Sequence, residues 1–344
     1  MASFHERFGN PFSGKDLDRL TAFLKEQDLD YDRNIEHTMI LEEEDRIIAT
    51  ASCHGNVLKC VAVSPDYQGH NLMGQLMTHM VEHFFEQGKT HYFGFTKPKN
   101  KDIFCSLGLY PVAQTENILL LENRKNGLKK YVEKLKKERD RALHEIKENP
   151  NGEGIGAIIA NCNPFTLGHR YLMEEASRQC RFLHVFILSE EQSFISTKER
   201  YELVKAGTEG LTNIILHKTS DYLISPAVFP TYFIKDKASA YEMNCMLDLE
   251  IFTKDIAPAL GINKRFAGTE PNCQVTNAYN ECMRKELPLN SIEFIEIPRK
   301  EIGGRPVSAS YVREAYKQGK LDEVKEYLPQ SSYQLLLNKR GLIC

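Results

Sequence analysis

Short apolar segments alternate with helical segments through the second half of this 344-residue chain. Strands are expected at Ile155–Asn161, Phe182–Leu188, Asn213–His217, Lys264–Gly268 and Ile292–Ile297. Helices are expected from His169, over Thr197–Gly207, around Tyr241–Ala257, over Val275–Lys285 and from Ser308. This alternation is typical of a parallel, doubly wound sheet with right-handed crossovers. Ligands of such sheets bind beyond the carboxyl ends of the strands, so a ligand site is expected there.

A phosphate-binding turn is predicted directly after the first of these strands, in Asn163–His169 (N-P-F-T-L-G-H). A strand, a tight turn and a helix bring free backbone N–H groups and the positive end of a helix dipole to one point, which favours an anion. Thr166 and His169 are three positions apart and therefore share one face of the first helical turn. Gly168 removes a side chain where a phosphate would approach the backbone.

A second helix start, Val307–Arg313 (V-S-A-S-Y-V-R), carries a matching set of donors. Ser308 and Ser310 supply hydroxyl groups, and Arg313 supplies a guanidinium fork that fits phosphate oxygens. Either segment alone is more often an ordinary helix cap than a ligand site. The two together, in this order and each at a helix start, favour a nucleotide site.

The pair resembles the signature of the nucleotidyltransferase superfamily, with a T/H-x-G-H turn early and an I-S-S-T-x-x-R-like helix start late. Those enzymes catalyse the attack of an acceptor substrate on the α-phosphate of a nucleoside triphosphate, with release of pyrophosphate. The resemblance implies catalytic roles for Thr166, His169 and Arg313, with Thr166 and His169 on the α- and β-phosphates. It implies that the remaining motif residues bind the nucleotide: Asn163, Pro164, Phe165, Gly168, Ser308 and Ser310.

Two further groups of residues fall at the same edge of the predicted sheet. Lys198 and Arg200, in S-T-K-E-R, would add positive charge there, although a surface helix with Lys198 paired to Glu202 is an equally good interpretation. The range 268–270 (Gly268, Thr269, Glu270) follows the fourth strand and would face adenosine. No set of metal-ligand residues can be identified from the sequence, and Mg²⁺ is expected to enter as a bridge between phosphate oxygens.

The first part of the chain is expected to be a separate domain of mixed α+β type over residues 1–122. Its element order, with V-S-P-D-Y-Q-G and a late N-x-x-x-F-x-x-L-G-L pattern, resembles the GNAT acyltransferase fold. In that fold a glycine-rich turn wraps the pyrophosphate of coenzyme A. Here Asn71 and Met73 stand where the turn has glycines, so we expect a binding module that does not transfer acetyl groups. A charged helix and hinge is expected over 123–154, before a Rossmann-like nucleotidyltransferase domain over 155–344.

A GNAT-like module followed by this nucleotidyltransferase-like domain resembles the citrate lyase ligase family over essentially the whole chain. Three strings carry the match: G-A-I-I-A-N-C-N-P-F-T-L-G-H-R-Y-L at 156–172, S-D-Y-L-I-S-P-A-V-F-P at 220–230 and G-T-E-P-N-C-Q-V-T-N-A-Y-N at 268–280. The resemblance implies ATP and acetate as substrates and acetyl-AMP as intermediate. It also implies a protein partner, the acyl-carrier subunit of citrate lyase, whose phosphoribosyl-dephospho-CoA group ends in the thiol to be acetylated.

Two other functions remain open on the sequence. An adenylyltransferase that joins AMP to a phosphorylated cofactor precursor would use the same phosphate motifs, but its acceptor would require extra basic residues near the first turn. A carrier-protein binding module without catalysis would leave the paired phosphate motifs unexplained.

Composition limits the classes of partner and the cellular compartment that are expected for this chain. The formal net charge is −3, which gives no electrostatic reason to expect nucleic acid or a membrane surface as partner. No apolar run is long enough for a membrane span, and the first ten residues lack the core of a signal peptide. The nine cysteines lack C-x-x-C pairs, so we expect reduced thiols in a cytoplasmic protein.

Overall fold

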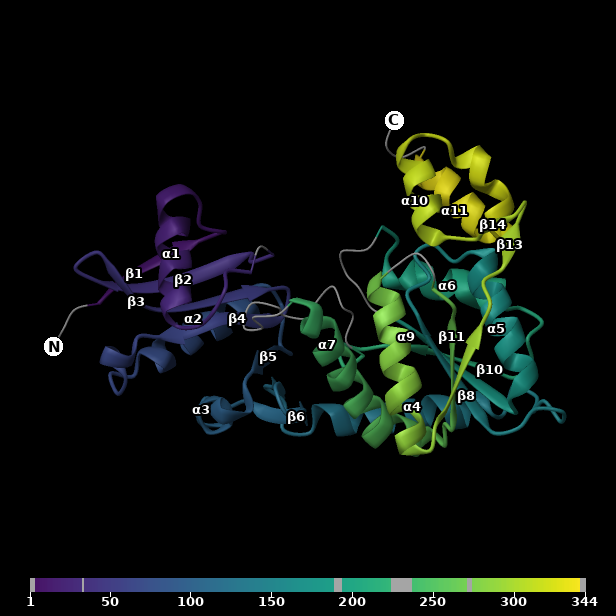
Figure 1. The fold of residues 1–344 in the computed structure, drawn as a ribbon, viewed down its shortest axis with the longest axis horizontal. Helices are drawn as coiled ribbons and strands as arrows, with labels where there is room; N and C mark the ends of the chain where they lie inside the picture. The colour runs from purple at the N-terminus through teal and green to yellow at the C-terminus, as the bar shows by residue number, and fades with distance from the viewer. Residues whose placement is uncertain (1–3, 33, 189–193, 224–236, 271–273, 341–344) are drawn as a thin grey trace. The chain divides into compact units, whose positions relative to one another are not determined.

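The computed structural model describes residues 4–32, 34–188, 194–223, 237–270 and 274–340 (Figure 1). Contacts within the chain divide it into two compact units. Unit 1 comprises Met1–Gly127 and Pro226–Glu250, and unit 2 comprises Leu128–Ser225 and Ile251–Cys344. The second unit is thus not continuous in sequence.

Unit 1 is built on a seven-stranded sheet with the order β1-β2-β3-β4-β5-β7-β6. Its strands are β1 (His5–Gly9), β2 (His37–Glu43), β3 (Arg46–His54), β4 (Val57–Val63), β5 (Phe93–Thr96), β6 (Tyr110–Gln114) and β7 (Leu119–Glu122). Its helices are α1 (Gly14–Glu26), α2 (Leu72–Glu86) and α3 (Lys101–Ser106), with most of α7 (Lys237–Ile251) from the later segment.

Strands β4 and β5 separate after a short pairing. They run parallel, yet the register joins only Val57 to Phe93 and Leu58 to Gly94. β4 continues to Val63. Its last residues therefore present one backbone edge that β5 does not pair, and a cavity described below lies along this edge.

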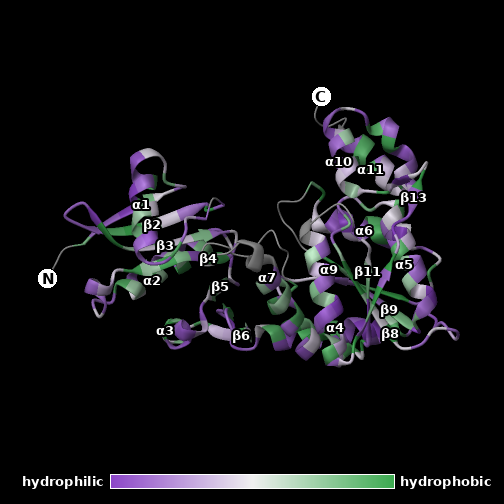
Figure 2. Ribbon diagram, viewed as in Figure 1, coloured by the Kyte–Doolittle hydropathy of each residue, from purple (hydrophilic) through white to green (hydrophobic). Residues whose placement is uncertain are grey.

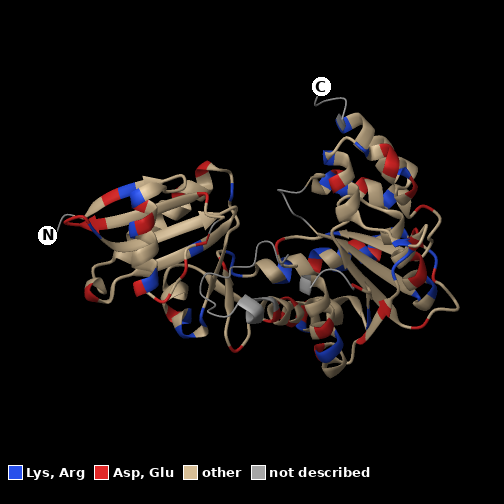
Figure 3. Cartoon of the chain, turned by 45° about the horizontal axis from the view of Figure 1, so that its top comes forward, with Lys and Arg blue, Asp and Glu red and all other residues tan. Residues whose placement is uncertain are grey.

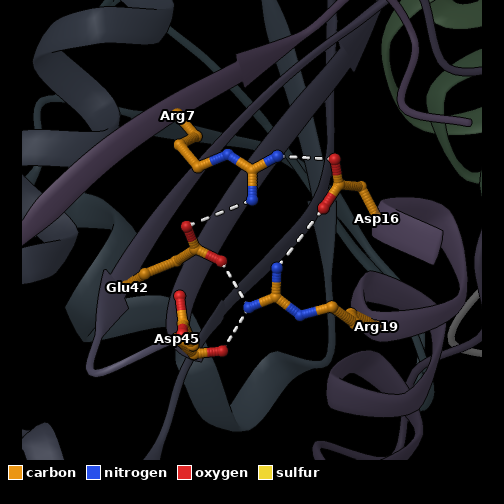
Figure 4. Close-up of polar contacts among 5 residues, drawn as sticks. All are labelled: Arg7, Asp16, Arg19, Glu42 and Asp45. Carbon is orange, nitrogen blue, oxygen red and sulfur yellow. Dashed lines mark hydrogen bonds and ion pairs between the residues drawn. The ribbon is translucent and has the colours of Figure 1, made fainter.

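A network of charged groups joins the first three elements of unit 1 (Figure 4). Arg7 of β1 contacts Asp16 at 2.5 Å and Glu42 of β2 at 3.4 Å. Arg19 of α1 contacts the same two carboxylates, at 3.3 Å and 2.6 Å. The Glu42 side chain is only 5% exposed and lies between two guanidinium groups. Each arginine thus bridges a strand and the helix, which fixes α1 on the sheet.

Unit 2 contains a five-stranded sheet in which every pair is parallel. Its strands are β8 (Ile155–Ala160), β9 (Phe182–Ile187), β10 (Ile214–Lys218), β11 (Lys264–Gly268) and β12 (Glu293–Ile297). Its helices are α4 (Gly127–Ala142), α5 (Leu167–Gln179), α6 (Thr197–Gly207), α8 (Ala257–Leu260), α9 (Gln274–Glu286), α10 (Ala309–Lys317) and α11 (Gln330–Arg340). A short hairpin, β13 (Glu301–Ile302) with β14 (Arg305–Pro306), precedes α10.

The strand order β10-β9-β8-β11-β12 confirms the predicted doubly wound sheet. The chain runs outward from β8 to β10, then returns to place β11 on the other side of β8. The topological switch point therefore lies between β8 and β11. These two strands pair only at Lys264–Gly156 and Arg265–Ala157, near their amino ends. Their carboxyl ends share no ladder pairing, so the sheet separates where a doubly wound fold binds its ligand.

Alternating residues of the strands divide between the two faces of this sheet. Leu183, Val185 and Ile187 of β9 belong to one buried core, which also contains residues of α5, α6, α10 and α11. Figure 2 shows the apolar character of these strands against the mixed helices. Figure 3 shows that acidic and basic residues are interspersed on the helices, while the strands carry few charges.

Helix α4 packs into unit 2, although the sequence predicts a solvated connecting helix over this segment. Leu135 is fully buried, and Glu138 accepts a hydrogen bond of 2.9 Å from His217 of β10. Arg139 donates to the carbonyl of Ala259 at 3.0 Å. The prediction missed these anchors because the partners of Glu138 and Arg139 lie far along the chain.

None of the helices among the described residues is both long and apolar enough to span a membrane. Within the same residues no disulfide joins any of the cysteines.

Candidate active site

The turn after β8 ends in a reciprocal cap at the start of α5. Thr166 is the N-cap, and its hydroxyl oxygen accepts a weak hydrogen bond from the His169 N–H at 3.4 Å. In return, the Thr166 N–H donates to Nδ1 of His169 at 3.1 Å, and the Thr166 hydroxyl lies 2.9 Å from the same nitrogen. This arrangement satisfies the Thr166 N–H and holds the imidazole ring in one orientation. The shared face of Thr166 and His169 that the sequence predicts is therefore an actual contact.

The environment of His169 favours its neutral form. Burial is the largest cause, followed by the positive charges of Arg299 and Arg313, and together they lower the pKa of His169 to about 4. The ring also stacks on Phe165, with centroids 6.0 Å apart. His169 is thus an uncharged, oriented imidazole in a positively charged setting.

The second motif forms the start of α10. Ser308 is the N-cap and accepts a hydrogen bond from the Tyr311 N–H at 3.4 Å. Arg313 donates to the Ser310 hydroxyl at 3.2 Å and to the carbonyl of Asn163, a residue 150 positions earlier in the chain. The guanidinium group therefore connects the two motifs directly.

The two helix starts also touch through Gly168. A Cβ atom placed on Gly168 would lie 3.3 Å from Cβ and from the carbonyl oxygen of Val307, the residue before Ser308. About nine in ten real Cβ contacts are longer than this, so it is glycine that allows the approach. The amino ends of α5 and α10 therefore meet beside the switch point of the sheet, and both dipoles contribute positive potential there.

The segment after β11 lies at the same edge of the sheet. Gly268 faces open space where a Cβ would project. The Thr269 N–H donates to Ile297 of β12 at 3.0 Å, and the Thr269 carbonyl accepts from Arg299 at 2.9 Å. Glu270 is buried and forms an ion pair with Arg299. Sequence reasoning missed Arg299; the signal available was an arginine directly beyond the end of the last strand, in I-P-R-K.

Several predicted site residues hold the turn together with their side chains. The Asn163 amide oxygen accepts from the Ile195 N–H at 3.1 Å, and Pro164 is buried. Phe165 is fully buried and fits closely against Gly207, where a Cβ would lie 2.1 Å from its ring. A contact from Pro164 or Phe165 to a nucleotide would therefore have to come from the backbone.

The two basic residues of α6 occupy different environments. Arg200 is fully buried and donates to the carbonyl of Asn161 at 3.0 Å and to the Thr197 hydroxyl at 3.0 Å. It thus ties the end of β8 to the first turn of α6. Lys198 is exposed, and in the described part of the chain it forms no ion pair with Glu202.

No metal-binding group of three or more His, Cys, Asp or Glu side chains occurs among the described residues. Near the switch point the acidic side chain of Glu270 is already paired with Arg299. The described residues therefore do not form a protein cage for Mg²⁺, which proteins commonly hold through substrate phosphates instead.

Unit 1 contains a cavity of about 660 Å³ along the unpaired edge of β4. Its lining includes the range 61–63 of β4, the range 94–96 of β5, and Lys97 and Lys99. The turn before α2 also lines it, where Asn71 adopts a φ of +57° and Met73 stands beside it. Asn71 thus adopts the backbone conformation that glycine would favour, while Met73 places a bulky side chain at the cavity.

Comparison with known proteins identifies both parts of the chain. Residues 155–336 match the family model of the citrate lyase ligase C-terminal domain, and residues 2–103 match that of the acetyltransferase (GNAT) family. Solved structures similar to the first part include Escherichia coli ElaA, at 16% identity, 36% coverage of this chain, 99% of that chain and a TM-score of 0.31. An acyl-CoA N-acyltransferase from Pseudomonas aeruginosa has 14% identity, coverages of 36% and 100%, and a TM-score of 0.32. TM-scores this low add no support to the match with the acetyltransferase (GNAT) family model.

Whole-length relatives are more informative. A [citrate [pro-3S]-lyase] ligase of Klebsiella pneumoniae is 38% identical over 323 residues, covering 92% of each chain. The enzyme of the same name from Escherichia coli (strain K12) is 36% identical over 94% of this chain and 91% of its own. That of Haemophilus influenzae is 37% identical over 94% and 95%. The chain therefore belongs to the citrate lyase ligase family, a family of ligases.

Proposed function

We propose that this protein uses ATP and acetate to acetylate the thiol of the prosthetic group on the acyl-carrier subunit of citrate lyase. The observation that carries the proposal is the meeting of two phosphate-binding helix starts at the switch point. Gly168 touches Val307, and Arg313 bridges to Asn163. The names of the whole-length relatives support citrate lyase as the partner.

The first step forms acetyl-AMP. An oxygen of the acetate carboxylate attacks the α-phosphorus of ATP, and the bond from this phosphorus to the oxygen bridging to the β-phosphate breaks, so pyrophosphate leaves. Such a displacement depends on positioning and on stabilising charge. Nε2 of His169 would donate to an α-phosphate oxygen, and one such donor is worth about 3 kcal/mol. Arg313, with the hydroxyl groups of Ser308 and Ser310, would hold the β- and γ-phosphates.

The second step transfers the acetyl group. The thiolate of the carrier's prosthetic group attacks the acetyl carbonyl carbon, a C–S bond forms, and AMP leaves with the electrons of the C–O bond. In the preceding step, Mg²⁺ carried by the triphosphate would supply positive charge for the leaving pyrophosphate. The cavity of unit 1 has the volume and the unpaired strand edge to hold the pantetheine arm of that group. Lys99 at its lining would contact the phosphates, whereas Lys97 is paired with Asp28 at 3.2 Å.

Acid-dependent exchange of labelled pyrophosphate into ATP tests the proposal. We expect exchange to depend on acetate, with longer acids less effective, and to need no carrier. Addition of the thiol carrier should then release one AMP for each thioester formed. Exchange that requires a phosphorylated cofactor precursor instead of a carboxylic acid would favour the adenylyltransferase. Carrier binding without any exchange would favour a binding module.

A further inference from the structure

Arg299 is part of neither phosphate motif, yet two acceptors fix one edge of its guanidinium group. Its Nε donates to the carbonyl oxygen of Thr269 at 2.9 Å. One of its terminal nitrogens donates to the Glu270 carboxylate, whose side chain is only 7% exposed. Both acceptors follow β11, while Arg299 follows β12, so the contact joins the ends of two neighbouring strands.

The rest of this guanidinium group has no protein acceptor in the ranges that the structure describes. An arginine offers five N–H donors, and the two contacts above use two of them. The Arg299 side chain is 28% exposed, so part of it is open to solvent. A guanidinium group that is fixed along one edge and open along the other suits the paired oxygens of a phosphate.

The neighbours of Arg299 place it beside the meeting point of α5 and α10. The carbonyl of Lys300 accepts from the Val307 N–H at 2.9 Å, and Val307 is the residue that touches Gly168. The Lys300 ammonium lies 5.4 Å from the ring centroid of Tyr171, two residues beyond His169 in α5. The positive charge of Arg299 is also felt at His169, where it contributes to the lowered pKa.

We propose that Arg299 is an additional phosphate-binding residue that contacts the triphosphate of ATP and the pyrophosphate it releases, and that Glu270 orients it. This inference rests on the proposed function, and it changes the role of Glu270. The sequence predicts that Glu270 faces adenosine, whereas here its carboxylate positions the guanidinium group. Arg299 and Arg313 then approach the phosphates from the segments after β12 and at the start of α10.

Equilibrium binding of inorganic pyrophosphate and of AMP to the full chain tests this directly. Arg299→Gln should weaken pyrophosphate binding about 10- to 100-fold, the range for loss of a charged hydrogen-bonding partner, with AMP binding unchanged. Arg299→Lys keeps the charge but loses the fork, and should weaken pyrophosphate binding about tenfold. The matched control is Arg284→Gln, which breaks the ion pair between the exposed Arg284 of α9 and Glu296 of β12. It should leave both affinities unchanged.

The positioning role of Glu270 is tested by the pyrophosphate and AMP affinities of two Glu270 variants. Glu270→Ala should reduce pyrophosphate affinity as Arg299→Gln does, and Glu270→Gln, which can still accept from Arg299, should restore most of it. Loss of AMP affinity in Glu270→Ala would instead show a contact with adenosine and overturn the positioning role. Pyrophosphate affinity in Arg299→Gln within twofold of that in Arg284→Gln would overturn the proposal for Arg299.

These outcomes are separate from failure of the proposed function. If the unaltered chain shows no acetate-dependent exchange, the proposed function fails. The pyrophosphate affinities of Arg299→Gln and Arg284→Gln would still show whether Arg299 binds phosphate. Should Arg299→Gln unfold at a lower temperature than Arg284→Gln, Arg299→Ala with added guanidinium ions provides the check. Recovery of pyrophosphate binding by millimolar guanidinium supports the contact, and absence of recovery in the folded variant contradicts it.

Discussion

At the scale of single residues, the cap of α5 determines which nitrogen of His169 carries the proton. A backbone N–H can only donate, so the bond from Thr166 at 3.1 Å requires an unprotonated Nδ1. The proton of the neutral ring is therefore on Nε2, the atom that the proposed mechanism directs at the α-phosphate. A proton added to Nδ1 would point at the Thr166 N–H, so two donors would face each other. This repulsion agrees with the lowered pKa of His169, about 4.

The tautomer leads to a paired prediction at His169. The amide nitrogen of glutamine lies about where Nε2 lies, and that of asparagine about where Nδ1 lies. We expect His169→Asn and His169→Ala to slow acetate-dependent pyrophosphate exchange by about 10²–10³, as for loss of one transition-state donor. His169→Gln should retain at least ten times more activity, on the order of one hydrogen bond. Equal losses in the Gln and Asn variants would argue against an Nε2 donor.

At the scale of elements, the geometry of the site depends on how closely α5 approaches α10. Gly168 and Val307 allow the approach, while Phe165 and Gly207 hold the turn against α6. Strands β8 and β11 pair only near their amino ends, so their carboxyl ends leave room for a ligand between them. Small residues and a short ladder thus bring together donors that lie far apart in sequence.

The contact at Gly168 predicts a graded effect of one methyl group. Gly168→Ala would force Val307 to shift by a few tenths of an ångström, because the Cβ would lie 3.3 Å from it. We expect acetate-dependent exchange to fall about tenfold, since small displacements of positioning groups are costly to rate. Gly94→Ala in unit 1, where a Cβ meets Leu109 at an ordinary 3.6 Å, is the matched control and should leave exchange intact. Full activity of Gly168→Ala would show that the close packing of α5 against the start of α10 is not needed for the reaction.

Helix α2 and strand β2 of unit 1 share a cluster of three histidines. Nε2 of His37 lies 2.7 Å from Nε2 of His79, and His37 stacks on His83 with ring centroids 3.9 Å apart. Burial is the largest cause that lowers the pKa of each, and for His37 the value falls to about 4. The fold thus favours all three in the neutral form.

This cluster predicts a loss of local stability in mild acid. Because each folded-state pKa is below the unfolded value of about 6.5, the full stabilisation is present above that pH and declines as pH falls towards the folded pKa. We expect the protection factors of residues 72–86, taken relative to the intrinsic exchange rate at each pH, to fall between pH 7 and pH 5, above the range in which ordinary carboxylates titrate. In His79→Gln the same peptides should depend less on pH over this interval. An unchanged pH dependence in that variant would exclude the cluster as the cause.

At the scale of the whole molecule, the two units carry different halves of the proposed reaction. Unit 2 holds the converging phosphate motifs, and unit 1 holds the cavity along β4. We predict that this cavity does not transfer acetyl groups from free acetyl-CoA, because the bulky Met73 side chain stands where glycine would let phosphate approach the backbone.

Filling the cavity should separate the two steps. Val61 lines it and is partly exposed, so we expect Val61→Trp to retain acetate-dependent pyrophosphate exchange while transfer to the carrier thiol falls at least tenfold. Val81→Trp places the same side chain on the outer surface of α2, where Val81 is 38% exposed, and should affect neither step. Undiminished transfer in folded Val61→Trp would contradict the presenting role of unit 1. Loss of exchange would show that both units contribute to adenylate formation.

The sequence determined the local features of this protein because their causes are local. Apolar runs and breaker residues predicted the bounds of the strands β8 to β12 to within one residue at either end. The spacing of Thr166 and His169 correctly placed both residues in one capping turn. The order of the elements was enough for the doubly wound sheet, because right-handed crossovers restrict the arrangements. Both helix starts that bind phosphate in the proposal were identified from the sequence alone.

Tertiary structure decided everything that depends on which distant segments meet. The bond from Arg313 to Asn163 and the pairing of Arg299 with Glu270 join segments with no fixed spacing, so no sequence pattern encodes them. Burial of Arg200 depends on where β8 ends relative to α6, and the anchoring of α4 depends on His217 of β10. Protonation is decided at the same level, because burial and the charges of two distant arginines hold His169 neutral.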